Sequence, residues 1–132
     1  MKNVLMACTF LLGIWATDPA FAHHSMAGFD RNKTVTLVGT VKYFKWANPH
    51  SWIEMEVPNT KGGVEVWDIE MTSPAVLIRA GWKSTFLKPG DKVTVAAHPL
   101  QTGDPGGTFV SVILPDGRTM TDRPPQSAGS KQ

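Results

Sequence analysis

The chain has 132 residues, with 13 Lys and Arg against 11 Asp and Glu, and a formal net charge of +2. The positive charges are scattered along the chain rather than clustered, so we expect no nucleic-acid partner. The single cysteine is Cys8. If the first 22 residues are removed, no thiolate metal site and no cysteine nucleophile remain.

The first 22 residues have the pattern of an export signal. Lys2 provides the positive start, Val4 to Ala16 is an apolar run too short for a stable membrane anchor, and Ala20-Phe21-Ala22 is a small-residue cleavage site. We therefore expect a periplasmic protein that is cleaved after Ala22 and has no transmembrane segment after cleavage. The expected organisation is a signal peptide at 1–22, an N-terminal arm at 23–34, a β-barrel domain at 35–120 and a disordered tail at 121–132.

Alternating apolar and polar residues predict a chain made mostly of short strands. Gly39 is expected to mark a bend or bulge, and a phase change between Val66 and Trp67 indicates another bulge. Ser73, Pro74 and Gly81 are the start and stop signals of one short helix. In chain order the expected elements are strands at Val35–Tyr43, Ile53–Val57 and Val64–Met71, the helix, a strand leading to Val95 and a strand at Thr108–Leu114.

This order predicts an all-β fold with one short helix. Three strands, a helix and two further strands form a small five-stranded barrel of the oligonucleotide/oligosaccharide-binding (OB) type. Closing the sheet into a barrel hides strand edges that would otherwise favour aggregation. The alternative is an open β-sandwich or meander with a similar number of strands.

The four histidines, His23, His24, His50 and His98, all follow the predicted cleavage site. Cleavage would give His23 a free α-amine beside its imidazole, and one more imidazole would complete a three-nitrogen histidine brace suited to Cu(II). We expect His50 and His98 in two loops at the same end of the barrel, with His98 pointing away from the core. The alternative is that the histidines cap turns or are solvated.

The predicted arm adds a geometric condition to this copper site. It starts at the opposite end of the first strand from the loop that carries His50. Its dozen residues span roughly 40 Å when extended, so the arm is long enough to fold back along the barrel.

Aromatic residues define a second candidate site. Trp46, Asn48, His50 and Trp52 surround one loop, and with Trp67 they would form a shallow surface for a sugar, a peptide or a protein partner. The alternative is that the rings form a small core under a loop or helix.

Catalysis is the less favoured class of function. His50 and Ser51 pair a base with a nucleophile in sequence only, because adjacent residues on a strand point to opposite faces. The chain also lacks a G-x-S-x-G elbow, an H-E-x-x-H helix and a phosphate loop. We therefore assign no catalytic residue and expect a binding module for a small ligand, a metal ion such as copper, or a periplasmic protein. A copper-dependent redox enzyme of the histidine-brace type ranks last.

Several segments together resemble one known family of exported proteobacterial proteins, the domain-of-unknown-function family 6152. The segments are AHHS, FDRNKTVTLVGTV, WANPHSW, SPAVLIRAGW, LKPGDKVTV, HPL and LPDG, in this order along the chain. The resemblance implies a small periplasmic β-rich domain whose activity is not established. It marks pattern positions without assigning them chemistry, namely His23, His24, Ser25, Asn48, Pro49, His50, Trp52 and His98.

Overall fold

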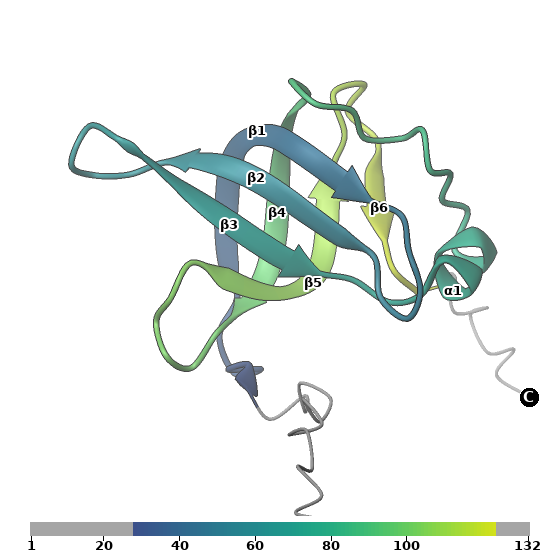
Figure 1. Cartoon of the computed structure of the whole chain (residues 1–132), viewed down its shortest axis with the longest axis horizontal. Helices are drawn as coiled ribbons and strands as arrows, with labels where there is room; N and C mark the ends of the chain where they lie inside the picture. Colours follow the sequence, from purple (N-terminus) through teal and green to yellow (C-terminus); the bar gives the residue numbers. More distant parts are fainter. Residues whose placement is uncertain (1–27, 124–132) are drawn as a thin grey trace, which may run out of the picture.

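A computed structural model describes residues 28–123 of the chain. In this part of the chain six strands and one helix follow one another (Figure 1). They are β1 (Val35–Lys45), β2 (Trp52–Pro58), β3 (Val64–Glu70), α1 (Pro74–Arg79), β4 (Lys92–Pro99), β5 (Gly106–Ile113) and β6 (Thr119–Thr121).

The strands close into a five-stranded barrel. β1 pairs with β2 and β4, β2 pairs with β3, and β4 pairs with β5, all antiparallel. A short parallel pairing of Asp68–Glu70 in β3 with Gly106–Thr108 in β5 joins the two ends of the sheet. The OB-like barrel is therefore confirmed, and the open sandwich is excluded because the sheet has closed on itself.

A sixth strand extends the sheet beyond the barrel. β6 pairs with the second half of β5, where β5 no longer contacts β3. The indole nitrogen of Trp82 donates a hydrogen bond to the Thr121 carbonyl over 2.7 Å. The domain boundary expected at residue 120 thus falls inside β6, and residues 124–132 of the predicted tail lie outside the described part.

The core fills the barrel from all five strands. Ile53, Met55, Ile69, Val95 and Val112 are completely buried. At the α1 end, aromatic rings continue this core, with Trp82 packed edge-to-face on Phe109 at 5.7 Å between ring centroids and tilted against Phe44 at 6.1 Å. Burying this apolar surface supplies the main stabilising free energy of the fold.

The bulge in β1 lies at Lys42 rather than at Gly39. The register between β1 and β2 shifts between Val41 and Tyr43, so Phe44 turns inward while Tyr43 is exposed. Gly39 has a different role: a Cβ atom there would lie 2.3 Å from a backbone carbonyl oxygen of β2. Only glycine permits this close approach of β1 and β2.

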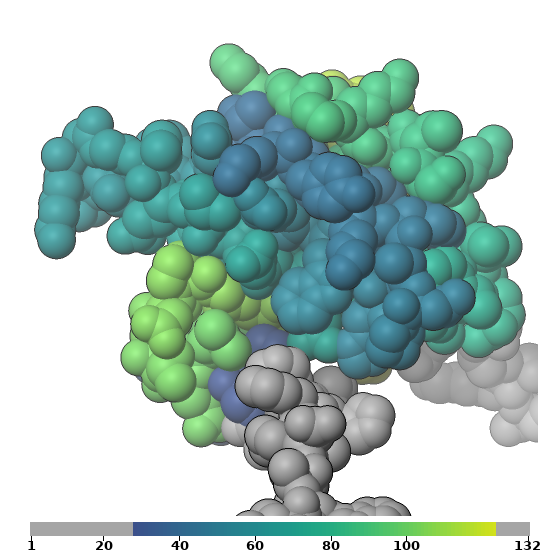
Figure 2. All heavy atoms as spheres, viewed as in Figure 1, coloured from purple at the N-terminus to yellow at the C-terminus, as the bar shows by residue number. Residues whose placement is uncertain are grey.

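The bulge expected between Val66 and Trp67 is absent. β2 and β3 pair in continuous register from Trp52 and Glu70 to Pro58 and Val64. The turn of this hairpin projects from the body of the molecule (Figure 2). Val64 and Val66 lie on the outer face without cover, and these exposed apolar residues explain the break in the apolar pattern before Trp67.

The described chain enters the barrel beside the loop between β4 and β5. Phe29 forms a β-bridge with Leu100, the amide of Asp30 donates to the Pro99 carbonyl, and the amide of Gln101 donates to the Gly28 carbonyl. Within residues 28–123, no helix is long and apolar enough to cross a membrane.

Candidate functional site

Strand pairing brings Glu70, Thr108 and His98 into one row across the barrel. Glu70 in β3 is opposite Thr108 in β5, and Thr108 is opposite His98 in β4. Neighbouring strands are about 4.8 Å apart, so the backbones of Glu70 and His98 are separated by about 10 Å. The histidine face, defined as His50, Glu70, Thr108 and His98, lies on the outside of this row.

His50 is held beside Glu70 by the end of β3. It follows the cis peptide bond between Asn48 and Pro49, and its Nδ1 atom contacts Oε1 of Glu70. The Glu70 side chain is only 10% exposed, whereas the His50 side chain is 46% exposed. Because a buried carboxylate needs a partner, this contact keeps the imidazole on the histidine face.

The backbone of the His50 loop is anchored at the following residue. The amide of Ser51 donates to the Thr72 carbonyl over 3.1 Å, and the amide of Met71 donates to the Ser51 carbonyl over 2.8 Å. The loop is therefore tied to the residues that directly follow β3.

His98 is held by the chain that precedes β1. Its Nδ1 atom lies 2.6 Å from the Lys33 carbonyl oxygen, and its side chain points away from the core, as predicted, while Val95 and Ala97 are buried. A carbonyl oxygen only accepts hydrogen bonds, so Nδ1 carries the hydrogen. In the neutral ring the lone pair is then on Nε2.

His50 has the same arrangement with a different acceptor. An ionised Glu70 carboxylate also only accepts, so Nδ1 of His50 donates to it and Nε2 keeps the lone pair in the neutral ring. Orientation of an imidazole by an acceptor at its second nitrogen is typical of histidines that bind metals.

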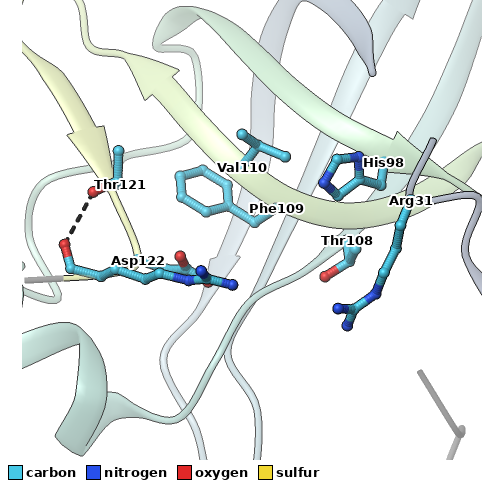
Figure 3. A pocket seen from close by; sticks show the side chains of 8 residues that line it. Arg31, His98, Thr108, Phe109, Val110, Thr121 and Asp122 are labelled. Carbon is cyan, nitrogen blue, oxygen red and sulfur yellow. Dashed lines mark hydrogen bonds between the residues drawn. The ribbon is translucent and has the colours of Figure 1, made fainter. Parts of the chain in front are cut away.

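The two histidines line adjoining cavities. His50 lines one of about 300 Å³ with Glu70, and His98 lines one of about 360 Å³ (Figure 3). The two cavities share Thr108, Asp122 and Arg123 as wall residues. The cavities lined by His50 and by His98 therefore adjoin on one side of the barrel.

Asp122 is the carboxyl common to both cavities. Burial raises its pKa above the ordinary value, and the positive charge of Arg123 opposes this shift. A raised pKa favours the neutral carboxylic acid. As the pH falls towards that pKa, Asp122 loses its negative charge and competes less with other anions for the neighbouring Arg123.

The described residues do not complete a metal site by themselves. Within residues 28–123, no group of three or more His, Cys, Asp or Glu side chains is placed to hold a metal ion. His23 and His24 lie outside the described residues.

The arm enters at the opposite end of β1 from the His50 loop, as expected, yet it lies close to Glu70, which His50 contacts. The parallel pairing of β3 with β5 brings the arm and His50 to the same side of the barrel. Phe29, Trp52, Glu70 and Leu100 line one cavity there. The chain consequently enters the fold directly beside Glu70.

The predicted tryptophans do not form one surface. Trp67 is opposite the buried Met55 and packs against the core, and Trp46 packs against the core edge-to-face with Phe44. Trp52 lies on the opposite face of β2. The continuous aromatic platform is therefore absent, and Asn48 is left exposed in its loop.

Sequence reasoning missed four polar residues of this region, namely Glu70, Arg31, Asp122 and Arg123. The alternation of β3 places Glu70 on the face opposite Ile69, but only strand pairing shows that His50 covers it. The arginines and Asp122 lie outside the main strands, in segments that the pattern described as an arm and a tail.

The fold and the histidine face together define a small OB-like barrel with two adjoining polar cavities on its outer surface. The chain belongs to the Family of unknown function (DUF6152), which matches residues 13–109. No curated protein matches it. Among solved structures it is similar to the mitochondrial single-stranded DNA-binding protein Rim1 of S. cerevisiae, with 12% identity and a TM-score of 0.45, covering 62% of this chain and 93% of that one.

Proposed function

We propose that this protein is a non-enzymatic periplasmic binding module that binds copper on the histidine face through Nε2 of His50 and of His98. The observation that carries the proposal is the pair of oxygen acceptors at the Nδ1 atoms, Glu70 for His50 and the Lys33 carbonyl for His98. Both imidazoles thereby have their lone pairs on Nε2, the atom available to a metal.

The N-terminal arm would supply the remaining ligands. His23 is five residues before Gly28, a distance of up to about 17 Å in an extended chain, and Gly28 is hydrogen-bonded beside the β4–β5 loop. Cleavage after Ala22 would add the α-amine of His23 to its imidazole. The export-signal pattern of the first 22 residues supports both this cleavage and the periplasmic location.

The donor set favours Cu(II) over other divalent ions. Imidazole and amine nitrogens suit tetragonal copper, and Cu(II) binds such sites more tightly than the other first-row divalent metals. Residues 23–132 contain no cysteine, so the proposed site has no thiolate ligand.

The experiment is a titration of the mature chain, starting at a native His23, with Cu(II) and with Zn(II). Calorimetry and electron paramagnetic resonance are expected to show one tight Cu(II) site with nitrogen ligands and weaker Zn(II) binding. His50→Ala and His98→Ala should each weaken Cu(II) binding at this site. Unchanged affinity in both variants would refute the role of the histidine face, and an extra residue before His23 separates a brace from a site built of imidazoles alone.

The acceptor at His50 allows a sharper test. Glu70→Gln should lower Cu(II) affinity about tenfold, which is a small effect for the loss of an acceptor that orients a metal-binding histidine, because the His50 side chain is half exposed. Glu54→Gln is the matched control, since Glu54 lies on β2 and pairs with Lys42 instead. Equal losses of affinity in the two variants would contradict the assigned tautomer.

A further inference from the structure

Beside the histidine face, two arginines line the same cavity as His98. Arg31 and Arg123 both line this cavity, together with Thr108. Figure 3 shows the Arg31 guanidinium beside Thr108, facing the same open space as Asp122. Among the described residues, none of the ion pairs involves either arginine.

Arg31 is positioned by a tight turn. The Lys33 amide donates to the Asp30 carbonyl over 3.1 Å, and the Asn32 amide donates to the Asp30 carboxylate over 3.1 Å. The same carboxylate lies 3.7 Å from the Lys33 ammonium. Asp30 is thus engaged away from Arg31, and the turn that presents Arg31 also presents the carbonyl that binds His98.

Arg123 is positioned by the segment that follows β6. The Thr121 carbonyl accepts the indole hydrogen bond of the buried Trp82, and the Thr121 hydroxyl donates to the Arg123 carbonyl over 3.1 Å. The backbone that bears Arg123 is therefore held by the aromatic core. Two segments that are anchored separately thus each bring one guanidinium group to the same cavity.

We propose that this cavity binds an oxyanion, the carboxylate or phosphate group of a small ligand, between Arg31 and Arg123. Guanidinium groups present planar donor pairs that match the oxygens of such anions. The Thr108 hydroxyl adds a neutral donor at the wall. This site requires no metal, so it goes beyond the proposed copper binding and stands or falls separately.

Asp122 limits the affinity of this site. It is the one carboxylate among the described residues that line the cavity, and it competes with the ligand for the guanidinium groups when it is ionised. Asp122→Asn should therefore tighten anion binding. This effect has the opposite sign to that of removing an arginine, so a general loss of structure would not reproduce both.

The test uses the full mature chain in metal-free buffer, prepared by resin rather than with a carboxylate chelator. Inorganic phosphate and acetate are titrated separately at constant chloride, with amide chemical shifts of Arg31, Thr108 and Arg123 as the readout. We expect saturable shifts confined to these residues. Binding of phosphate alone identifies a phosphate-bearing ligand, binding of acetate alone identifies a carboxylate, and binding of neither overturns the proposal.

Variants complete the test. Arg31→Gln and Arg123→Gln should each weaken binding about tenfold, as expected for the loss of a charge-assisted contact. Arg79→Gln is the control, because Arg79 is exposed in the last turn of α1 and does not line the cavity. An equal loss in Arg79→Gln would overturn the site and leave only nonspecific attraction to positive charge.

Discussion

The same substitution in two tryptophans, Trp82 and Trp67, tests how much a buried hydrogen bond contributes to the stability of this fold. Trp82 is 2% exposed, and its indole nitrogen donates to the Thr121 carbonyl over 2.7 Å. The indole nitrogen of Trp67 is also buried, but it has no hydrogen-bond partner among the described residues. Replacing each residue by Phe removes the N–H group and part of the ring.

The expected costs differ because only one hydrogen bond is lost. Trp82→Phe loses a hydrogen bond of about 1 kcal/mol and buried ring carbons of about 1–1.5 kcal/mol, so the free energy of unfolding should fall by about 2–2.5 kcal/mol. Trp67→Phe loses a similar part of the ring, but it also removes a buried unsatisfied donor that costs about 1–3 kcal/mol. Its net effect should be close to zero.

Urea unfolding followed by far-UV circular dichroism measures both variants under the same conditions. For a domain of this size, the loss in Trp82→Phe corresponds to a fall in Tm of about 10–20 °C. The same variant should also weaken oxyanion binding, because it releases the segment that carries Arg123. Equal destabilisation of Trp67→Phe and Trp82→Phe would refute the reasoning, since ring burial alone would then account for both.

Two further stability predictions concern the strands of the barrel. Gly39→Ala should cost about 2–3 kcal/mol in urea unfolding, because its Cβ would overlap a β2 carbonyl oxygen at 2.3 Å; Gly63→Ala, with its nearest atom at 3.5 Å, should change stability little, and similar losses would contradict the steric argument. Asp68 has its pKa raised above 3.8 by burial and by the negative charge of Glu54, so its stabilising contribution is complete below that value and is lost as the pH rises through the raised pKa. Asp68→Asn should therefore be more stable than wild type at neutral pH and equal to it in acid, and a difference independent of pH would contradict this linkage.

Much of the fold was predictable because its signals are local. The helix starts at Pro74 after Ser73, and the chain turns at Gly81, which has a φ of 87°. Inward alternation in the second strand, with Ile53 and Met55 buried, also follows from sequence. β6 was not predictable in this way, because three residues carry no periodicity and this strand exists only by pairing with β5.

The predicted positions of the bulges were wrong for a related physical reason. Alternation shows that successive residues face opposite sides, but it does not show which side is covered. On the projecting hairpin, the exposed Val64 and Val66 resemble inward residues, and the β1 bulge at Lys42 exchanges the faces of Tyr43 and Phe44. Burial depends on contacts with distant strands, which are absent from a local pattern.

The candidate site likewise combines residues that the sequence indicates with residues that only the folded structure reveals. His50 and His98 were expected to converge, because the order of strands in an OB-like barrel defines where their loops lie. Glu70 and Arg123 became visible only through a contact with His50 and through the anchoring of β6 by Trp82. Neither contact has a sequence signature, because each joins segments that are far apart along the chain.

The parallel pairing of β3 with β5 matters most for the proposed copper site. It joins residues 68–70 to 106–108 and thereby places the entry of the chain beside Glu70 and Leu100, which line one cavity with Phe29. The five residues from His23 to Gly28 would then be enough to reach the histidine face, and the arm would not have to run back along the whole barrel. A histidine brace completed by the arm is thus geometrically easier in the folded protein than the order of strands along the chain suggests.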